Sequence, residues 1–363
     1  MKKHILWTVG VVAIVAILIA ISLPGKKQTI QPLNIGVVTA LTGDFAFYGE
    51  STRVGVELAQ KDLRKEGINA QFIFEDGQTD ATKALNAAQK LVDVDGVSGI
   101  YSEFTPGAIA ISSFVKGKNV LHVYDASPVS PLVSNPLVYK TYIDYIAGCR
   151  MVAEYLKRKG VKSVGVLQAN AEFGELCAQG VRSVFGPSVF AETYNIGTTD
   201  FRTPLLKLRQ HNVEVVFNPS FPTETITSIK EIRELGLKIP FVAESDAFSS
   251  DTLAENSGSL GGVITFGLPH SSPEFERHLK EELPDQKIGY IDAAALGYIH
   301  ARQIARALSQ CDDDVSCVQN KMDNAASESI IGFGGFQNHV AQFTMPIQEF
   351  RNGRFETVMD SGE

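Results

Sequence analysis

Six segments that follow apolar runs are rich in hydroxyl, carboxylate and aromatic side chains. Such side chains accept and donate hydrogen bonds and offer ring faces, and none of the six segments holds a nucleophile–base pair or a metal-ligand set. The chemistry that they could do together is the binding of a small molecule in a cleft. The segments are ALTGDFAFYG (40–49), YSEFTPG (101–107), YDASPVSP (124–131), NAEFGE (170–175), NPSFPTE (218–224) and ESDAF (244–248).

The motifs of common phosphate-, nucleotide- and metal-dependent enzymes are absent from the sequence. It has no G-x-x-x-x-G-K-[ST], G-x-S-x-G or H-E-x-x-H, and Gly43 and Gly49 lie six apart, unlike G-x-G-x-x-G. GFGG at 332–335 follows an expected helix and is typical of a turn. The seven histidines are scattered along the chain. We therefore expect no enzyme activity, no metal and no cofactor.

Apolar runs alternate with amphipathic stretches after residue 33. This alternation predicts βαβ units and parallel sheets covered by helices on both faces. In the stretch 80–93, Ala84, Ala88 and Leu91 share one helical face, and Asp80 stands where an N-cap belongs. Because ligands bind at the carboxyl ends of strands in open α/β sheets, the six polar segments should meet there. The expected strands are 34–39, 71–75, 97–101, 119–124, 163–168, 213–217, 240–243 and 262–267.

The length and charge of the chain narrow the class of protein further. At 363 residues with 44% apolar content, the chain exceeds one typical domain, and a break in the pattern near 143–148 predicts two α/β lobes. The formal net charge is −8 and no run of lysine or arginine forms a basic face, so we expect no nucleic-acid partner.

The N-terminus predicts a membrane-spanning helix. MKKH precedes nineteen uncharged residues (5–23), which at about 1.5 Å per residue just span a hydrocarbon core of roughly 30 Å. SLPGKK, at the end of this run, has no A-x-A-like cleavage site. A lipoprotein would need a cysteine directly after the run, and the first cysteine is Cys149. We expect an uncleaved anchor that holds the body on the extracytoplasmic face of the cell membrane. A cleaved signal peptide is the alternative, and in both cases the body is exported.

Export makes disulfide bonds possible for the four cysteines. Cys311 and Cys317 in QCDDDVSCVQ are close enough to close a small loop, and we expect them to pair. Cys149 and Cys177 fall in two successive expected helices, where a disulfide and two buried thiols are both compatible with the sequence.

Several longer stretches run in one order over nearly all of residues 33–360. They are IGVVTALTGDFAFYGES, with its T-G-x-x-x-x-Y-G turn, FEDGQTDATKALNAAQKLV, YDASPVSPLV, AEFGELCAQG, FRTPLLKLRQHNVEVVF and NGRFETV. Together these stretches resemble the type I periplasmic substrate-binding proteins of ABC importers, in particular the leucine/isoleucine/valine-binding family.

The resemblance implies two doubly wound parallel-sheet lobes joined by a hinge of three crossovers. After the membrane segment and linker of residues 1–32, lobe 1 would comprise 33–144 plus 270–330, and lobe 2 would comprise 145–269 plus 331–363. A ligand would lie between the lobes and close them about the hinge.

The resemblance also implies a set of ligand-binding residues. Tyr48 matches a tyrosine that flanks the ligand, Asp246 matches an acid that takes the ligand's ammonium, and Phe173 and Phe221 match positions usually held by tyrosines. Phe45 and Phe47 are interpreted as local packing. The full set is Tyr48, Tyr101, Ser102, Glu103, Tyr124, Ala126, Ser127, Phe173, Phe221, Asp246 and Tyr290.

The chain departs from the family pattern at two positions. An ungapped match puts Glu103 where a family serine holds the ligand's carboxylate, and Pro128 where a threonine contacts the ligand. A slip of one residue would put Ser102 and Ser127 there instead. In the ungapped match Glu103, Asp125, Glu244 and Asp246 crowd one cleft with no arginine, which favours a cationic or neutral polar ligand. The alternative is that Glu103 and Asp125 cap helices and point to solvent.

The sequence thus predicts an extracytoplasmic substrate-binding protein, acting as a monomer. It would capture a small amino-acid-like ligand and deliver it to the permease of an ABC transporter. A ligand-sensing ectodomain acting on a membrane partner and, less well supported, an α/β enzyme are the alternatives.

Overall fold

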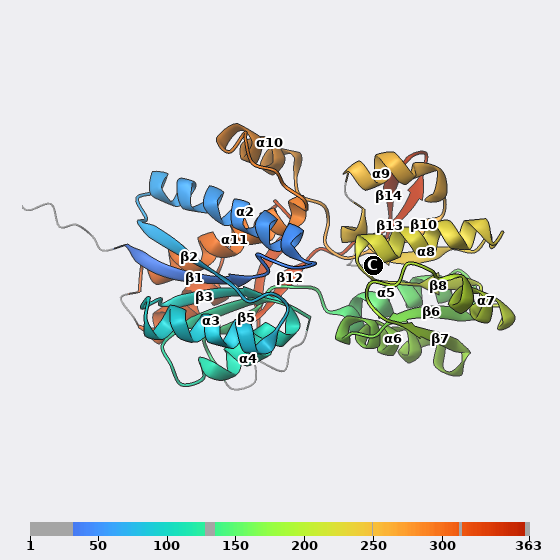
Figure 1. Cartoon of the computed structure of the whole chain (residues 1–363), viewed down its shortest axis with the longest axis horizontal. Coiled ribbons are helices and arrows are strands. Elements are labelled where there is room, and N and C mark those ends of the chain that lie inside the picture. Colours follow the sequence, from blue (N-terminus) through green and yellow to red (C-terminus); the bar gives the residue numbers. More distant parts are fainter. Residues whose placement is uncertain (1–31, 128–134, 249, 312–313, 360–363) are drawn as a thin grey trace, which may run out of the picture. The chain divides into compact units, whose positions relative to one another are not determined.

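The computed structural model describes residues 32–127, 135–248, 250–311 and 314–359, and Leu33–Glu363 form one compact unit. Within the described residues there are two seven-stranded sheets, and each is covered by helices to give an α/β lobe (Figure 1). No helix among those residues is long and apolar enough to span a membrane, and the predicted spanning segment 5–23 lies outside them.

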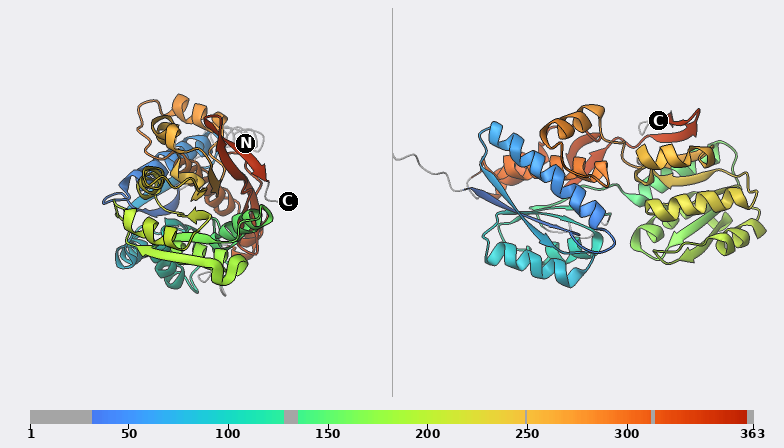
Figure 2. Two further views of the ribbon diagram at one scale, coloured as in Figure 1. Left: turned by 90° about the vertical axis from the view of Figure 1, so that its right-hand side faces the viewer. Right: turned by 45° about the horizontal axis from the view of Figure 1, so that its top comes forward.

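The first sheet is parallel except at one edge, where β11 runs antiparallel to β12. Alternate side chains of its strands contact different helices: Ile35 and Val37 pack with α2 and α11, whereas Val38 and Ile100 pack with α3 and α4. The helices therefore lie on both faces (Figures 1 and 2). In spatial order the strands are β11 (Phe333–Gln337), β12 (Val340–Phe343), β5 (Val138–Lys140), β4 (Leu121–Asp125), β3 (Gly99–Glu103), β1 (Leu33–Thr39) and β2 (Ala70–Asp76). The helices are α2 (Ala46–Lys65), α3 (Ala81–Asp93), α4 (Thr105–Phe114), α10 (Pro273–Glu282), α11 (Ile291–Leu308) and α12 (Val315–Asp323).

The second sheet repeats this plan, with a parallel centre and the antiparallel strands β13 and β14 at one edge. Its spatial order is β14 (Arg354–Met359), β13 (Ile347–Arg351), β10 (Val263–Phe266), β9 (Phe241–Glu244), β8 (Val215–Phe217), β6 (Val164–Ala169) and β7 (Val189–Tyr194). The helices are α5 (Tyr145–Arg158), α6 (Glu172–Phe185), α7 (Arg202–Gln210), α8 (Pro222–Glu234) and α9 (Ser250–Asn256), with short 3₁₀ turns η2 (Gly186–Ser188), η3 (Ser245–Ala247) and η4 (Ser257–Ser259).

Sheet membership changes three times along the chain: after β5, after β10 and after β12. One predicted boundary differs from this topology. Residues 331–363 were assigned to the second lobe as a whole, but β11 and β12 pair within the first sheet, so the last change falls between Phe343 and Ile347. The pattern of parallel strands could not reveal the place of β11 and β12, because they form a hairpin of which only β12 pairs with the sheet, at its edge strand β5.

Six observed strands lie outside the eight predicted ones. β5 has only three residues, β7 is a half-exposed edge strand, and β11–β14 form hairpins with glycines and charges, so none has a continuous apolar run. The predicted strand 97–101 is displaced to Gly99–Glu103, which puts Ser102 and Glu103 inside a strand rather than in the following loop.

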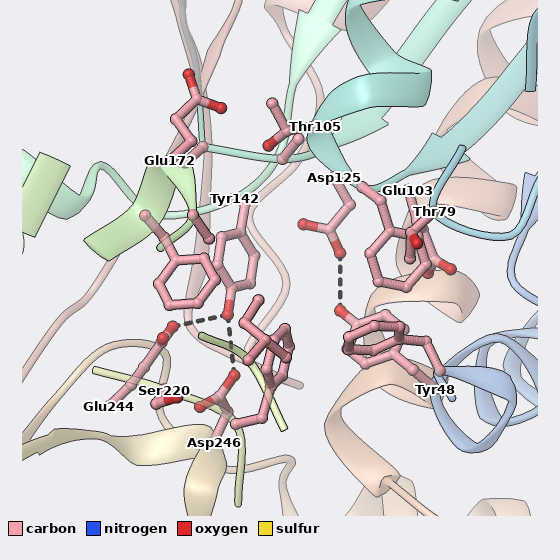
Figure 3. Close-up of a pocket in the computed structure, with 18 of the residues that line it drawn as sticks. Tyr48, Thr79, Glu103, Thr105, Asp125, Tyr142, Glu172, Ser220, Glu244 and Asp246 are labelled. Carbon is pink, nitrogen blue, oxygen red and sulfur yellow. Dashed lines mark hydrogen bonds between the residues drawn. The ribbon is translucent and has the colours of Figure 1, made fainter. Parts of the chain in front are cut away.

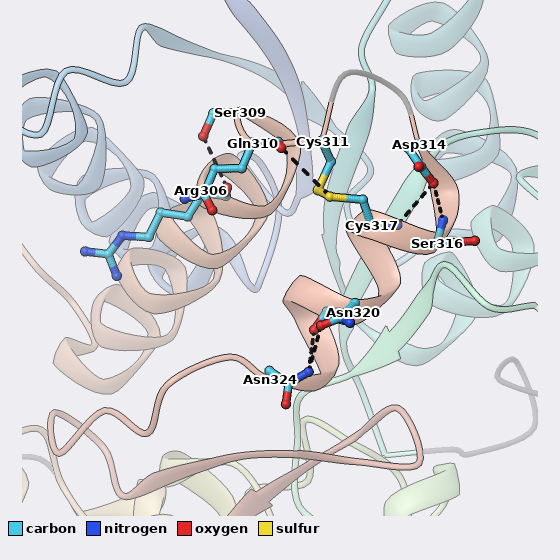
Figure 4. The surroundings of a disulfide bond; sticks show 9 residues. All are labelled: Arg306, Ser309, Gln310, Cys311, Asp314, Ser316, Cys317, Asn320 and Asn324. Carbon is cyan, nitrogen blue, oxygen red and sulfur yellow. Dashed lines mark hydrogen bonds between the residues drawn. A yellow bond between two sulfur atoms is a disulfide. The ribbon is translucent and has the colours of Figure 1, made fainter.

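Two local expectations can be compared directly with the structure. Asp80 caps α3, since its side chain accepts a hydrogen bond from the Lys83 amide at 2.8 Å. Disulfide bonds join Cys311 to Cys317, at the start of α12 (Figure 4), and Cys149 of α5 to Cys177 of α6. The second bond settles the alternative that the sequence left open for Cys149 and Cys177.

Candidate ligand-binding site

A cavity of about 410 Å³ lies where strand ends of both sheets meet (Figure 3). Every one of the six polar segments contributes lining residues, as does the crossover after β5. The lining is mostly aromatic and acidic: nine rings and five carboxylates, with no lysine, arginine or histidine among the lining residues that the structure describes. The rings are Phe45, Phe47, Tyr48, Phe104, Tyr142, Tyr145, Phe173, Phe221 and Tyr290, and the acids are Glu103, Asp125, Glu172, Glu244 and Asp246.

Two glycines bring helices close to strand ends and so place rings at the cavity. A Cβ atom at Gly49 would lie 2.1 Å from the carbonyl oxygen of Ala40, and one at Gly174 would lie 2.3 Å from that of Ala169. Only glycine permits these approaches. Tyr48 and Phe173, the residues just before these glycines, both line the cavity. The T-G-x-x-x-x-Y-G turn of the first sheet and the A-E-F-G turn of the second thus have the same use.

Glu103, at the end of β3, is held by hydroxyl groups on both of its oxygens. Thr52 donates to Oε1 at 2.6 Å, Tyr101 donates to Oε1 at 3.2 Å, and Thr39 donates to Oε2. Burial raises the pKa of the Glu103 carboxyl to about 7, against these hydrogen bonds, which favour the ionised form. Glu103 is buried and caps no helix, so the alternative of a solvent-directed cap does not hold.

Asp125, at the end of the neighbouring strand β4, has one oxygen engaged and one free. The Tyr48 hydroxyl donates to Oδ2 at 3.2 Å, and the Tyr101 hydroxyl lies 3.5 Å from the same atom. Oδ1 is buried and has no hydrogen-bond partner among the residues that the structure describes. Burial, and next the charge of Glu103, raise the pKa of Asp125 well above its usual value.

The cation whose charge acts on Asp125 is Lys140, and it is not among the residues that line the cavity. Lys140 is fully buried, and its Nζ donates to the carbonyl oxygens of Tyr142 and, at 3.1 Å, of Ile143. Burial lowers the pKa of Lys140 to about 8, while the charges of Asp144 and Asp125 act in the opposite sense. Its charge thus reaches Asp125 from behind the cavity wall.

On the second-sheet side, two acids share one tyrosine hydroxyl. The Tyr142 hydroxyl lies 2.7 Å from Glu244 Oε1 and 3.1 Å from Asp246 Oδ2, and the Tyr145 hydroxyl donates to Glu244 Oε2 (Figure 3). Burial raises the pKa of Glu244 to about 7. Burial and the charge of Glu244 raise the pKa of Asp246 well above its usual value. One hydroxyl proton cannot serve two carboxylates fully, so this arrangement favours a proton on the acid pair.

Rings from both sheets are in contact in the cavity. The ring centroids of Phe45 and Phe221 are 4.7 Å apart, those of Tyr48 and Tyr290 are 5.4 Å apart, and those of Phe173 and Phe221 are 5.6 Å apart. These spacings are typical of favourable aromatic pairs. Phe45, interpreted from the sequence as local packing, is therefore part of the lining, as is Phe47.

Phe104 has an uncommon backbone conformation at the edge of the cavity. Its φ is +66°, and its amide donates to the Asp125 carbonyl oxygen at 3.1 Å. A non-glycine residue with positive φ is strained, and such strain is often found at functional sites. Here it lets α4 start directly after β3, with the Phe104 ring 5.6 Å from those of both Phe45 and Tyr48.

The structure brings most of the predicted ligand contacts together, although contact with a ligand stays a prediction. Eight of the eleven line the cavity: Tyr48, Glu103, Ala126, Ser127, Phe173, Phe221, Asp246 and Tyr290. Tyr101 lies behind it, buried against Glu103. Ser102 and Tyr124 are buried on the opposite face of the sheet, where Ser102 Oγ lies 2.7 Å from His122 Nε2 and Tyr124 packs with the α3–α4 layer.

The alternation of side chains along β3 explains which correspondence fits. Successive residues of a strand point to opposite faces, so Ser102 and Glu103 cannot both face the cavity. Glu103 does so, and this favours the ungapped correspondence at that position. At the other position of doubt, Ser127 lines the cavity, and Pro128 lies outside the described residues.

The site set predicted from the sequence lacked several lining residues. Tyr142 and Tyr145 stand in the crossover and at the start of α5, not at a strand end, so the strand-end rule could not find them. Their signal was the TYIDY stretch at the break in the α/β pattern. The sequence places Asp125 and Glu244 among the acids near the cleft, and Thr105 and Ser220 lie in two of the six polar segments, whereas Thr79 lies in none of them.

Comparisons with known proteins agree with this geometry. The sequence profile of the family described as "Periplasmic binding protein" matches residues 32–354. Among curated proteins, the Leu/Ile/Val-binding protein homolog 6 of Brucella suis biovar 1 is 27% identical over 279 residues, which cover 72% of this chain and 71% of that protein.

Solved structures share the fold at low sequence identity. The leucine binding protein LivK of Thermotoga maritima superposes with a TM-score of 0.76 at 18% identity, covering 91% of this chain and 99% of that one. A solute binding protein of an ABC transporter from R. palustris, in complex with 4-hydroxybenzoate, has a TM-score of 0.78 at 18% identity, covering 91% and 96%. The substrate binding protein LivJ of Streptococcus pneumoniae, in complex with isoleucine, has a TM-score of 0.75 at 15% identity, covering 91% and 99%.

Proposed function

The chain belongs to the periplasmic binding protein family, and from this premise we propose that it is the substrate-binding protein of an ABC importer. It captures a small amino-acid-like ligand on the extracytoplasmic side of the cell membrane and delivers it to the permease. The apolar segment 5–23 holds it there as an anchor or, if cleaved, has directed its export.

The observation that carries this proposal is one cavity lined from both sheets. A ligand in that cavity contacts both lobes at once, so it stabilises the arrangement in which the lobes meet around it. A permease that recognises this arrangement would accept the loaded protein in preference to the empty one. The lobes that move would be 33–144 with 270–343 and 145–269 with 344–363, as sheet membership suggests.

The size and lining of the cavity support a small ligand with an apolar body. A volume of about 410 Å³ is at the lower end of small-molecule sites. Tyr48 and Tyr290 from one side, and Phe173 and Phe221 from the other, would contact that body, and Asp246 would accept the ligand's ammonium group. The structural neighbours named above hold isoleucine and 4-hydroxybenzoate, both small molecules with an apolar body.

Binding without turnover tests this function. We would purify the full chain in detergent and measure its melting temperature with free amino acids, amides, amines and aromatic acids. A ligand at about 100 times its dissociation constant adds about 2.7 kcal/mol to the free energy of unfolding. Recovery of the ligand unchanged after incubation excludes an enzyme, whereas a new product would contradict the proposal.

The membrane partner separates transport from sensing. We expect cross-linking of the ligand-loaded chain in its native membrane to capture an ABC permease. Capture of a receptor or transducer instead would favour the ligand-sensing ectodomain.

A further inference from the structure

The charges that line the cavity are all of one sign. Glu103, Asp125, Glu172, Glu244 and Asp246 line it, whereas no described lining residue carries a basic group. Lys140, whose charge acts on Asp125, donates to two backbone carbonyls and is not among the lining residues. A ligand carboxylate would therefore meet several acids and no side-chain cation, which disfavours it electrostatically.

These acids do not form a metal site. Among the residues that the structure describes, no three of the His, Cys, Asp and Glu side chains converge on a position that could hold a metal ion. Glu103 and Glu244 each have both oxygens engaged with hydroxyl groups of the protein. These two acids are part of the cavity's own hydrogen-bond network and have little capacity left for a ligand.

Asp125 differs from them because it has an oxygen left over. Asp125 is 5% exposed, and its Oδ1 has no hydrogen-bond partner among the described atoms. Figure 3 shows its carboxylate directed into the space between Tyr48 and Tyr142. Ser127, two residues on, is 8% exposed and lines the same cavity, and within the described part of the chain its hydroxyl oxygen has no partner. Buried polar atoms of this kind are normally satisfied, so a donor supplied by a ligand fits both of them.

The rings supply the second half of a cation site. Tyr48 and Phe104 have their ring centroids 5.6 Å apart, and Tyr290 lies 5.4 Å from Tyr48. The faces of such rings attract an ammonium group, and they also cover an apolar body by contact. An ammonium near Asp125 would thus have the carboxylate oxygen on one side and aromatic rings around it.

We propose, on the basis of the binding function above, that the ligand is an organic ammonium ion with an apolar or aromatic body and no carboxylate group. This ligand has the ammonium group and the side chain of an amino acid, but it lacks the carboxylate group, which Glu103 and Asp125 would repel. Asp125 Oδ1 accepts from the ammonium, and Ser127 completes the polar end. Asp125 thus takes the role that the family correspondence gives to Asp246, which lies on the other side of the cavity.

Matched sets of three compounds test the proposal directly. The first set is 2-phenylethylamine, phenylalanine and 3-phenylpropanoate; the second is 3-methylbutylamine, leucine and 4-methylpentanoate. Within each set the body is the same, and only the ammonium and the carboxylate are added or removed. We would measure dissociation constants for the full chain in detergent by isothermal titration calorimetry. We expect the amine to bind at least about 10-fold more tightly than the amino acid, and the acid not to bind.

Asp125→Asn tests the residue, with Asp285→Asn as the matched control. Asp285 is exposed and lies outside the cavity, so its substitution should leave binding unchanged. Asp125→Asn should weaken amine binding roughly 100-fold and narrow the difference between amine and amino acid. A merely structural role would not change this selectivity. If Asp125→Asn does not fold, the pH dependence of ligand binding by the unmodified chain tests the charge of the ligand instead.

The sign of the pH dependence separates a cation from the other ligand types. An ammonium favours the ionised form of the acids, so binding should release protons and weaken as the pH falls from about 8 to about 6. The titratable groups that interact with Asp125 are Glu103, Glu244, Tyr101, Tyr48 and Lys140, and those that interact with Asp246 are Glu244, Tyr48, Tyr142, Tyr145, Tyr290, His270 and Asp292. Proton uptake, with tighter binding at low pH, would indicate a carboxylate or a neutral acceptor and would overturn the proposal.

The outcomes distinguish this inference from the function on which it rests. If phenylalanine or leucine binds as tightly as its amine, or if 3-phenylpropanoate binds best, the ligand class is wrong and the binding function stands. If none of the six compounds binds but a different compound of the wider panel does, the charge of that compound decides. A compound that is not a carboxylate-free ammonium ion shows that the ligand class is wrong and leaves the binding function standing, whereas a carboxylate-free ammonium ion agrees with the proposal. If no compound of the wider panel raises the melting temperature, the binding function itself is contradicted.

Discussion

On the first-sheet side of the cavity, Glu103 accepts from Thr39, Thr52 and Tyr101, whereas on the second-sheet side Glu244 and Asp246 share the hydroxyl of Tyr142. Both sides bury two acids and hold them with hydroxyl groups. On the first side four hydroxyl groups hold the two acids, and one oxygen of Asp125 has no partner among the described residues. On the second side only two hydroxyl groups of the described residues, those of Tyr142 and Tyr145, hold the two acids, and Asp246 has only the one that it shares with Glu244, so the pair keeps a proton more readily.

This difference suggests a division of roles between the sides. The first side has a rigid, well-satisfied acid beside a free one, which suits recognition of a fixed group. The second side has a coupled pair of acids and an apolar wall of Phe173 and Phe221, which suits contact with a body of variable shape.

The largest effect is expected in the pH dependence of stability. The pKa of Glu103 rises from 4.5 to about 7 on folding, so the unfolded chain binds fewer protons between these values. The contribution of Glu103 to stability is therefore least unfavourable below about pH 4.5 and becomes unfavourable by about 3 kcal/mol as the pH rises through 7. Other acids, such as Asp62 and Glu66, have lowered pKa values and act in the opposite sense.

A glutamine substitution isolates the contribution of each side. Relative to the parent chain, Glu103→Gln should gain about 3 kcal/mol of stability between about pH 5 and about pH 8, measured by urea unfolding of the empty protein. Glu244→Gln should show a gain of similar size, since its pKa is also raised to about 7. If the difference in unfolding free energy between one of these variants and the parent did not change with pH, that glutamate would have an unshifted pKa, and the two sides would not bury their acids equally.

The next effect concerns the hydroxyls that hold the acids. Tyr142→Phe removes the donor shared by Glu244 and Asp246, and Tyr48→Phe removes one donor, at 3.2 Å, from Asp125. At neutral pH we expect Tyr142→Phe to lower the free energy of unfolding by about 2 kcal/mol, because two acids lose their shared donor. We expect Tyr48→Phe to lower it by about 1 kcal/mol, because one acid loses one hydrogen bond. Denaturant titration of both variants beside the parent gives the ranking. Equal losses would contradict the idea that the second side is short of donors.

The strand-end rule predicted that the six polar segments meet at one site. All six polar segments contribute to it, because parallel strands bring their carboxyl ends to one edge of each sheet. Two individual rings of the cavity could also be predicted, because a glycine follows each of them. Gly49 and Gly174 each let the first turn of a helix contact a strand end, so the positions of the preceding Tyr48 and Phe173 are largely fixed.

The parts that could not be predicted depend on register and on connections. The apolar pattern ends the predicted strand at residue 101, two residues before its observed end, so the alternation that turns Glu103 to the cavity and Ser102 away from it could not be applied. Tyr142 lies in a crossover whose path depends on the assembled sheets. The hairpin of β11 and β12 joins the first sheet by one edge pairing with β5, which no local pattern encodes.

The smallest effect is the coupling between Phe45 and Phe221, which face each other from the two sides of the cavity. Their ring centroids lie 4.7 Å apart, and such pairs contribute about 1 kcal/mol beyond the area that they bury. A double-mutant cycle of Phe45→Ala, Phe221→Ala and both together, analysed by urea unfolding, should give a coupling of about 1 kcal/mol in the empty protein. The pair of Phe173 and Phe221, both on the second-sheet side at 5.6 Å, is the control whose coupling does not depend on the two sides being in contact. A coupling near zero for Phe45 and Phe221, with the control pair still coupled, would mean that the sides are apart until a ligand binds. The coupling should then appear when 2-phenylethylamine is added, and its appearance would measure how much of the contact between the two sides the ligand provides.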